Sequence, residues 1–587
     1  DGESYAKLYF GEGVIQRGRW AQIAYTFDES GQAGYVDGVQ VGSRTGGLKP
    51  KTEGLALIVG RGELYKSGGH FSGLIADVRV FDRALSEDEL LDLYKIRAGR
   101  MGKDVALFTR PKVDARVYPD AEKIVVFADV DRMRQLVPRG AQLSVEVRRS
   151  HDEAALVESI ASIRDHRAEI ILDGSALAPG SYVVDVRLVD RKGRRIGKAA
   201  KAKVAWRERS ASFERVKVLN NFVMELFNGQ LEPGQAKTTF YNPRDGWVFF
   251  SLAPGVRTQG APDIVLDGIG AGPLMPRRSN DGSTFEAIRH LKEGEHEVEL
   301  KADAGGTPIT LVVRAVPEIQ YVYYPRDPKI KPHGPYDWQF LSRDVLANVT
   351  TLVTQTDSPP HLDRWTSMGR KMISITSLPR INGKDASEQI GEAYAHWTTA
   401  TGMKHPSING IIVDEFTGGD LPIYRVYREA VERIYANPDL AGRSFYAFST
   451  LLYGNKVTED FARAVIAGGG RVCWESYFGE YADREEARDA FDGMVRKMIG
   501  WQEALPGITD RMIIVLGYMA QPTYSTNFYP SVDFKVGMDM QVRLLATHPV
   551  FFGLGGLSQW ASSYADEETV RWSGRLYRHY CIEGNTE

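Results

Sequence analysis

Over residues 1–318 apolar and polar positions alternate in short runs that Gly and Pro interrupt, a pattern that indicates half-buried β-strands. Examples are "GRWAQIAYTF" near the start, "GSYVVDVRLVD" in the middle and "TPITLVVRAV" near the end. Asp37-Gly38 separates two such runs and predicts a two-residue hairpin turn. We therefore expect antiparallel sheets over this part of the chain.

One helix is expected within the first hundred residues. The run 73–80, "GLIADVRV", predicts a strand, and the segment that follows it has helical spacing of leucines. Ser86 stands three residues before Glu89, which predicts a capping box at the start of that helix.

From about residue 319 the pattern changes to apolar runs separated by amphipathic helical segments. The runs are "IQYVYYP", "NVTTLVTQ", "KMISIT", "INGIIVDEF", "SFYAFST", "RVCWESY", "MIIVLGY" and "VFFGLGGLSQW". Alternating strands and helices predict parallel strands with crossovers. Eight repeats in this length favour a closed (β/α)8 TIM barrel, and a doubly wound open sheet is the alternative. No G-x-G-x-x-G follows the first run, which argues against a dinucleotide site.

The length of 587 residues predicts about four domains, at roughly 150 residues each. We expect β-modules over 1–98, 105–206 and 210–318, followed by the barrel over 319–587. The fold class is thus three all-β sandwich-like modules and a C-terminal barrel. The strands of 105–206 resemble immunoglobulin-like sandwiches of secreted bacterial enzymes.

The first module resembles the laminin-G-like, concanavalin-A-type jelly roll. The matching pieces are Gly18–Trp20, the hairpin Tyr35–Gly38 and the closing segment Gly73–Val80 with Leu85-Ser86. The resemblance covers only the C-terminal half of such a module, and the chain begins "DGES" without Met. It implies an incomplete sandwich whose open edge a neighbour or an upstream segment covers. We expect this module to brace the barrel, with glycan binding as the alternative.

The overall composition gives little evidence for a nucleic-acid partner, a membrane span, a disulfide framework or a metal site. A net charge of −3 offers no electrostatic argument for nucleic acid or a membrane surface. No apolar run reaches the ~18 residues that span a bilayer. The two cysteines, Cys473 and Cys581, are expected to be buried free thiols. No metal-type spacing occurs, so we expect neither a metal nor a cofactor.

The candidate chemistry lies where the barrel strands end, because a barrel of this type carries its active site at the carboxyl ends of its strands. Asp414 and Glu415 end the fourth strand, and Glu475 ends the sixth. Amide, acidic, basic and aromatic side chains at the other ends are the expected substrate-binding residues. They are Tyr324, Arg326, Gln355, Asp357, Trp474, Tyr477, Tyr518, Gln521, Gln559 and Trp560.

Such a ring suits the cleavage of glycosidic bonds. One carboxylic acid protonates the leaving oxygen, and a second carboxylate attacks the anomeric carbon or activates water. The arrangement resembles barrel-type glycoside hydrolases, in which an acid at the end of strand four recurs. It departs from one large clan, since strand four lacks the Asn-Glu pair and strand seven ends in Tyr518 where that clan has Glu. It also lacks the D-x-x-D-x-D-x-E run of chitinase-like enzymes.

We expect Glu415 to be the general acid, Asp414 its charged neighbour, and Glu475 the nucleophile or base. If Asp414 faces the mouth instead, the first two roles are exchanged. Structural interpretations stay open: the acids of strand four could cap the following loop, and Glu475 could pair with a barrel Arg. Trp474 and Trp560 could simply belong to the core.

The sequence thus favours a bacterial glycoside hydrolase that is secreted, periplasmic or displayed on the cell surface, and that acts on a polysaccharide or complex glycan. The first alternative is a glycan-binding or adhesion protein whose barrel is degenerate. A polysaccharide lyase, with Tyr518 as base beside Arg326, is a weaker alternative. No nucleic-acid partner and no membrane span are expected.

Overall fold

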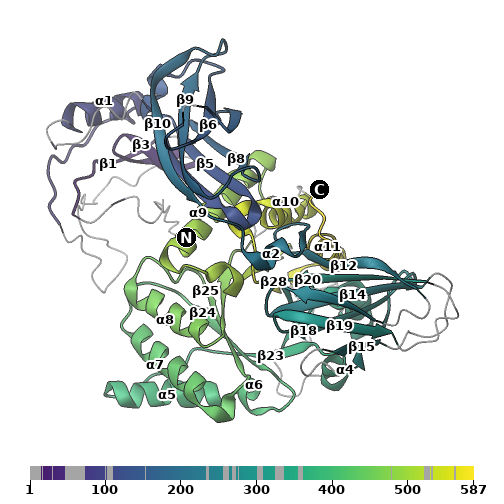
Figure 1. The fold of residues 1–587 in the computed structure, drawn as a ribbon. Helices are drawn as coiled ribbons and strands as arrows, with labels where there is room; N and C mark the ends of the chain where they lie inside the picture. Colours follow the sequence, from purple (N-terminus) through teal and green to yellow (C-terminus); the bar gives the residue numbers. More distant parts are fainter. Residues whose placement is uncertain are drawn as a thin grey trace. The chain divides into compact units, whose positions relative to one another are not determined.

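The computed structural model describes residues 15, 18–28, 31–45, 73–98, 101, 110–152, 154–232, 237–254, 264–267, 273–274, 277–300, 308–323, 336–354, 361–477, 479–520, 529, 533–560 and 564–587. The chain forms two compact units, Asp1–Arg207 and Glu208–Glu587. Each unit buries apolar cores of its own. Figure 1 shows the antiparallel sheets of both units and the helices that surround the barrel.

The first unit begins with an antiparallel sheet and one helix. Its elements are β1 (Ile23–Phe27), β2 (Gly31–Val36), β3 (Val39–Thr45) and α1 (Glu87–Ala98). Asp37 and Gly38 both have positive φ, 52° and 76°, so the predicted hairpin turn is confirmed. The capping box is confirmed as well, because the Ser86 N–H donates to Glu89 at 2.8 Å and the Glu89 N–H donates to Ser86 Oγ at 3.3 Å.

The strand predicted over 73–80 is not formed. These residues have no ladder partner among the described residues, and Leu74 and Val80 are 79% and 75% exposed. An apolar alternation becomes a strand only when a neighbouring strand accepts its hydrogen bonds. Residues 46–72 of this module lie outside the described residues. The incomplete jelly roll therefore stays a prediction.

The rest of the first unit is a sandwich of two antiparallel sheets, ordered β10-β9-β6-β7 and β4-β5-β8. The strands are β4 (Lys112–Tyr118), β5 (Lys123–Asp129), β6 (Gln142–Arg149), β7 (Val157–Ser162), β8 (Arg167–Asp173), β9 (Gly180–Val189) and β10 (Arg195–Trp206). The alternating run quoted from this module, "GSYVVDVRLVD", forms β9. The buried Tyr182 donates its hydroxyl to the carbonyl of Ala178 at 2.6 Å, a corner like that of immunoglobulin-type sandwiches.

The second unit opens with another sandwich, in which the short helix α2 (Ala211–Glu214) precedes two sheets ordered β11-β12-β20-β14-β18-β17 and β13-β19-β15-β16. Leu, Val, Ile and Phe side chains of both sheets form its core. The strands are β11 (Lys217–Val218), β12 (Met224–Leu231), β13 (Lys237–Asn242), β14 (Gly246–Pro254), β15 (Ile264–Asp267), β16 (Pro273–Leu274), β17 (Arg277–Arg278), β18 (Phe285–Leu291), β19 (Gly294–Leu300) and β20 (Ile309–Val316).

The second unit continues into a closed barrel of parallel strands, and the predicted TIM barrel is thus confirmed. The strands are β21 (Glu318–Tyr323), β22 (Thr351–Thr354), β23 (Lys371–Thr376), β24 (Gly410–Phe416), β25 (Ser444–Ser449), β26 (Arg471–Glu475), β27 (Met512–Gly517) and β28 (Gly556–Trp560). The helices between and after them are α3 (Trp338–Asp344), α4 (Leu362–Ser367), α5 (Ala386–Thr399), α6 (Thr401–Lys404), α7 (Ile423–Ala436), α8 (Lys456–Ala467), α9 (Arg484–Ala504), α10 (Phe534–Thr547) and α11 (Glu567–Leu576), which a π-helical turn (Tyr577–Ile582) extends.

The inside of the barrel is apolar in its middle and ionic at the amino ends of its strands. Val322, Ile412 and Cys473 are among the side chains that fill the middle. At the amino end the buried Glu318 pairs with Arg471, with Nε and Oε2 3.0 Å apart, and accepts the Tyr446 hydroxyl at 2.9 Å. Burial opposes ionisation of Glu318, but the Arg471 and Lys371 charges outweigh it and lower its pKa to about 2. This ionic cluster lies at the end of the barrel opposite the carboxyl ends of the strands.

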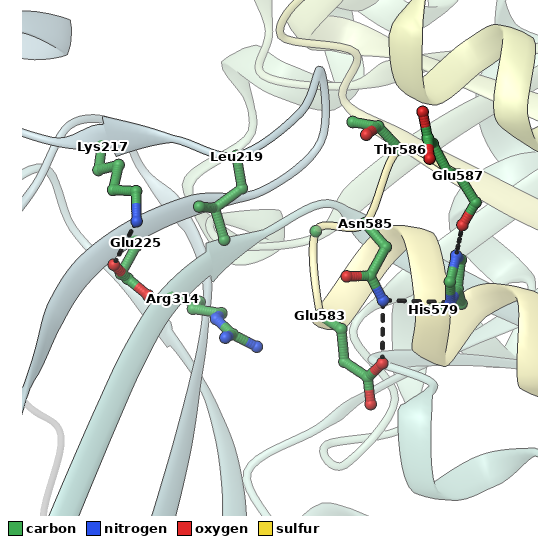
Figure 2. A pocket seen from close by; sticks show the side chains of 10 residues that line it. Lys217, Leu219, Glu225, Arg314, His579, Glu583, Asn585, Thr586 and Glu587 are labelled. Atoms are coloured by element: carbon green, nitrogen blue, oxygen red, sulfur yellow. Dashed lines mark hydrogen bonds and ion pairs between the residues drawn. The ribbon is translucent and has the colours of Figure 1, made fainter.

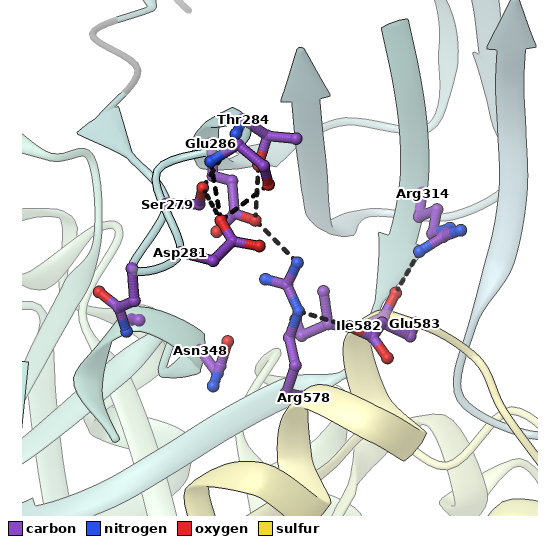
Figure 3. Close-up of polar contacts among 12 residues, drawn as sticks. Ser279, Asp281, Thr284, Glu286, Arg314, Asn348, Arg578, Ile582 and Glu583 are labelled. Carbon is purple, nitrogen blue, oxygen red and sulfur yellow. Dashed lines mark hydrogen bonds and ion pairs between the residues drawn. The ribbon is translucent and has the colours of Figure 1, made fainter. Parts of the chain in front are cut away.

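The sandwich of the second unit is fastened to the barrel by polar contacts. The Asn221 amide donates to the carbonyls of Leu545 and His548 at 2.9 and 2.7 Å. Figure 3 shows a second contact, in which Arg578 donates to Glu286 of β18 at 2.7 Å. These ties hold 208–316 and the barrel together as one compact unit.

Candidate active site

Asp414 points into the barrel near the carboxyl end of β24. Ile412, two residues earlier on β24, belongs to the interior core, and side chains two apart on a strand share a face. Burial, followed by the charge of Glu415, raises the pKa of Asp414 to about 6. A carboxyl with this pKa is partly protonated near neutral pH.

Glu415 does not continue the alternation of β24. Val413 pairs with Ala447 of β25, whereas Phe416 pairs with Ser449, so β24 contains one residue more than its neighbour over this stretch. Glu415 occupies this bulge with a left-handed backbone, φ 70°, and an exposed side chain. Of the two arrangements weighed from the sequence, the structure has the one in which Asp414 faces the interior.

Glu475 is the third carboxylate at this end of the barrel. Cys473, two residues earlier on β26, lies in the interior core, so Glu475 points inward too. Burial raises the pKa of Glu475, and the charges of Asp414 and Glu415 raise it further. β24 and β26 flank β25, which places the three carboxyl groups close enough to influence one another.

Cations do not neutralise this cluster in the described part of the structure. The expected alternative, an ion pair between Glu475 and a barrel Arg, is not formed there. Arg471 of the same strand pairs with Glu318 at the opposite end of the barrel. Uncompensated inward carboxyls lower stability, so packing alone gives no reason for Asp414 and Glu475.

Aromatic side chains lie in or against the interior apolar cluster. Trp560 belongs to the interior cluster and packs on Phe448, with ring centroids 4.6 Å apart. Tyr477 packs against the same cluster, and its ring lies over Gly517 at the end of β27. A Cβ atom on Gly517 would come within 2.5 Å of that ring, so glycine is required for this position of Tyr477.

Met519 and Tyr564 also pack against the interior cluster, and neither was among the expected substrate-binding residues. Each follows a strand end by two to four residues, β27 for Met519 and β28 for Tyr564. The only sequence feature that could have indicated these two residues is that each follows closely after the end of a barrel strand.

Three of the expected substrate-binding residues lie on the helix side of the strands and not at the mouth. Trp474 and Gln559 occupy outward positions of β26 and β28, and Tyr518 is buried beside Tyr577 of the π-helical turn. Gln559 accepts a hydrogen bond from Ser573 Oγ at 2.6 Å. These interpretations were wrong because parallel barrel strands are apolar on both faces, which hides the face that a residue occupies.

The remaining expected substrate-binding residues lie outside the described residues. They are Tyr324, Arg326, Gln355, Asp357 and Gln521.

A shallow cavity of about 630 Å³ lies away from the mouth, between the sandwich and the end of the chain. It has charges of both signs, including Lys217 and Arg314 from the sandwich and Glu583 beyond the π-helical turn (Figure 2). Because α11 starts at the carboxyl end of β28 and runs back along the barrel, this cavity lies toward the amino ends of the barrel strands. It does not contribute to the carboxylate site.

Metal and thiol chemistry find no support in the described residues. They contain no group of three or more His, Cys, Asp and Glu side chains placed to hold a metal ion. Cys473 and Cys581 are both buried, and burial raises the pKa of each thiol well above its ordinary value. Among the described helices, none has the length and apolarity needed to cross a bilayer.

Comparisons with known proteins are informative at the N-terminus. Residues 2–91 match a family model described as the concanavalin A-like lectin/glucanases superfamily, which confirms the resemblance seen in the sequence. No curated protein matched the chain.

Solved structures that resemble the chain include several carbohydrate enzymes. A β-glucuronidase from Ruminococcus gnavus is 11% identical over 77% of this chain and 62% of its own, with a TM-score of 0.29. A family 51 α-L-arabinofuranosidase from Bifidobacterium longum is 12% identical over 45% and 74%, with a TM-score of 0.28. The catalytic domain of a β-amylase from Paenibacillus polymyxa is 11% identical over 46% and 99%, with a TM-score of 0.21. Scores this low carry no argument about chemistry.

Proposed function

We propose that the chain is a glycoside hydrolase whose catalytic pair is Asp414 and Glu475. The observation that carries this proposal is the inward position of both carboxyl groups at the carboxyl ends of their strands, each with a raised pKa. The pKa of about 6 suits Asp414 to the role of general acid. Glu475 would then be the nucleophile or base. This assignment exchanges the roles first expected for the two acids of strand four.

In the proposed reaction Asp414 transfers its proton to the glycosidic oxygen as the bond to the anomeric carbon breaks. Glu475 either bonds to that carbon, forming a glycosyl-enzyme that water later hydrolyses, or takes a proton from the attacking water. Tyr477 and Trp560 supply apolar ring faces against which a sugar can stack. In the first route the Asp414 carboxylate left behind takes the proton from the water that hydrolyses the glycosyl-enzyme, and in the second both carboxyls return to their starting states by proton exchange with solvent.

The wider biological role is part of this proposal. We propose a secreted or surface-displayed enzyme that acts on a polysaccharide, with the domain boundaries given above. The concanavalin A-like match over residues 2–91 supports a module that braces the barrel or contacts the same polymer.

The lyase alternative loses its base, because the buried Tyr518 lies behind the sheet. A glycan-binding protein with a degenerate barrel is the remaining alternative. Two inward carboxyls with raised pKa favour the enzyme, since binding a neutral sugar does not require their mutual repulsion.

The test is a panel of polysaccharides assayed for new reducing ends with the wild type, Asp414→Asn and Glu475→Gln. Loss of one general acid or base costs roughly 10²- to 10⁴-fold in rate. On an aryl glycoside with a good leaving group, Asp414→Asn should recover much of its rate and Glu475→Gln should not. A protein that binds a glycan equally well in all three forms, and cleaves none, would establish the binding alternative.

A further inference from the structure

A second cavity, the rim cavity, lies between the first turns of α7 and α8 and has a volume of about 330 Å³. The two helices pack side by side (Figure 1). They follow the barrel strands β24 and β25, so their first turns lie at the carboxyl ends of the strands, the same end as Asp414. The residues that line the rim cavity are Asp420, Arg425, Arg428, Lys456, Val457 and Asp460.

The connection between β24 and α7 carries Asp420 and is held in place by hydrogen bonds. The Gly418 N–H donates to the buried Tyr424 hydroxyl at 2.9 Å. Thr450 Oγ1, in the connection between β25 and α8, donates to the carbonyl of Thr417 at 3.0 Å. The two connections thus brace each other, and the rim cavity is formed before any ligand binds, as is usual for binding sites.

Two side chains of the rim cavity have no protein partner. In the described part of the chain, the side chains of Arg425 and Asp420 form neither a hydrogen bond nor an ion pair, with each other or with any other group. Both are exposed. Arg425 offers five N–H donors with a full positive charge, and Asp420 offers two acceptor oxygens.

The other charged side chains of the rim cavity are already paired. Arg428 pairs with Glu432 along α7, with Nε and Oε1 3.5 Å apart. Lys456 pairs with Asp460 along α8, with Nζ and Oδ2 2.9 Å apart. The charge that the rim cavity leaves for an anionic ligand is therefore that of Arg425, and the free acceptor beside it is Asp420.

We propose that the rim cavity is an accessory subsite of the proposed hydrolase and binds an acidic sugar residue of the polymer. The inference rests on the proposed function, because a polymer held with one glycosidic bond at Asp414 extends over the rim of the barrel. The Arg425 guanidinium donates to the carboxylate or sulfate of the sugar, a geometry that its planar fork matches. Asp420 accepts hydrogen bonds from sugar hydroxyls. A neutral sugar would leave the charge of Arg425 without a partner.

The test is isothermal titration calorimetry with the full chain carrying Asp414→Asn, so that bound glycans are not cleaved. The probes are short oligosaccharides of galacturonic and of glucuronic acid, each with its methyl ester, and a sulfated galactan oligosaccharide with its desulfated form. We expect the acidic member of at least one pair to bind roughly tenfold more tightly than the neutral member. High salt should reduce this preference. The pair that shows it distinguishes a carboxylate from a sulfate.

Further substitutions in the same protein locate the binding. Arg425→Gln should abolish the preference for the acidic member, because Gln carries no charge. Asp420→Asn should weaken both members of a pair roughly threefold, because it removes an ionised acceptor of sugar hydroxyls. Arg433→Gln is the matched control: Arg433 is exposed on the same helix and lies outside the rim cavity. It should bind every probe as the Asp414→Asn protein does.

The outcomes separate the subsite from the catalytic proposal. If no acidic oligosaccharide binds more tightly than its neutral counterpart, or if Arg425→Gln keeps the preference, the rim cavity is not an acidic-sugar subsite. If the preference depends on Arg425 and the wild type releases no reducing ends from any polysaccharide, the subsite stands and the proposed hydrolysis fails.

Discussion

Asp414→Asn should make the protein more stable at alkaline pH while it removes activity. The folded protein holds Asp414 at a pKa of about 6, above the ordinary value of 3.8. At pH 8 the carboxylate is therefore ionised in a place that disfavours its charge. Asn has nearly the same shape and carries no charge, so the variant avoids this unfavourable term.

The magnitude follows from the size of the shift. A change of about two pKa units corresponds to about 3 kcal/mol, at 1.36 kcal/mol per unit. The carboxyl is partly open to solvent, and screening reduces this to about 1–2 kcal/mol. Because the folded pKa lies above the unfolded one, the contribution of Asp414 is favourable below about pH 4 and is lost as the pH rises through about 6.

Scanning calorimetry of the full chain between pH 4 and pH 8 tests this reasoning. At pH 8 the variant should unfold about 1–4 °C above the wild type, and at pH 4 the two should coincide. Asp420→Asn, in the exposed loop between β24 and α7, is the control and should show no such gain. A variant that is no more stable at pH 8, or equally stabilised at every pH, would refute the argument.

Further predictions concern the ionic cluster around Glu318, the mouth and the modular organisation. Glu318→Gln should destabilise the barrel by about 3–5 kcal/mol, since it leaves Arg471 buried without its counter-ion; a chemical denaturation curve measures this, and a loss below 1 kcal/mol would contradict it. Gly517→Ala should displace the Tyr477 ring and raise KM on the cleaved glycan with little change in Tm; an unchanged KM would remove Tyr477 from the site. A chain of residues 208–587 should fold and keep the activity of the whole; a folded but inactive chain would show that the first unit contributes to catalysis.

The alternation of apolar runs and helical segments along the chain predicted the barrel correctly. Each barrel strand is followed by a helix that leads back to the start of the next strand, so strands of similar length recur at regular intervals in the sequence. It also identified the strand ends at which Asp414 and Glu475 lie. The order of strands and helices and the positions of the strand ends depend only on where each element begins and ends in the sequence. They do not depend on which face of a strand a side chain occupies.

The sequence did not predict whether an individual strand side chain points into the barrel or toward the helices. Trp474 and Cys473 are equally apolar and equally buried, yet one faces the helices and the other the barrel interior. The one-residue bulge at Glu415 has no sequence signal of the usual kind, since a bulge in the left-handed conformation is normally marked by Gly. The assignment of the two acids of strand four therefore needed the three-dimensional structure.

The ties between sandwich and barrel have a consequence for how the sequence can vary. Asn221 donates to the carbonyls of Leu545 and His548, and Asn220 donates to those of Tyr580 and Asn585. For these two asparagines every acceptor is a backbone atom, which any amino acid provides. The four residues whose carbonyls accept these hydrogen bonds can therefore be substituted without loss of the bonds. Substitution of either Asn removes the side-chain amide that donates them. At these contacts, substitutions should be tolerated on the barrel side and not at the two asparagines of the sandwich.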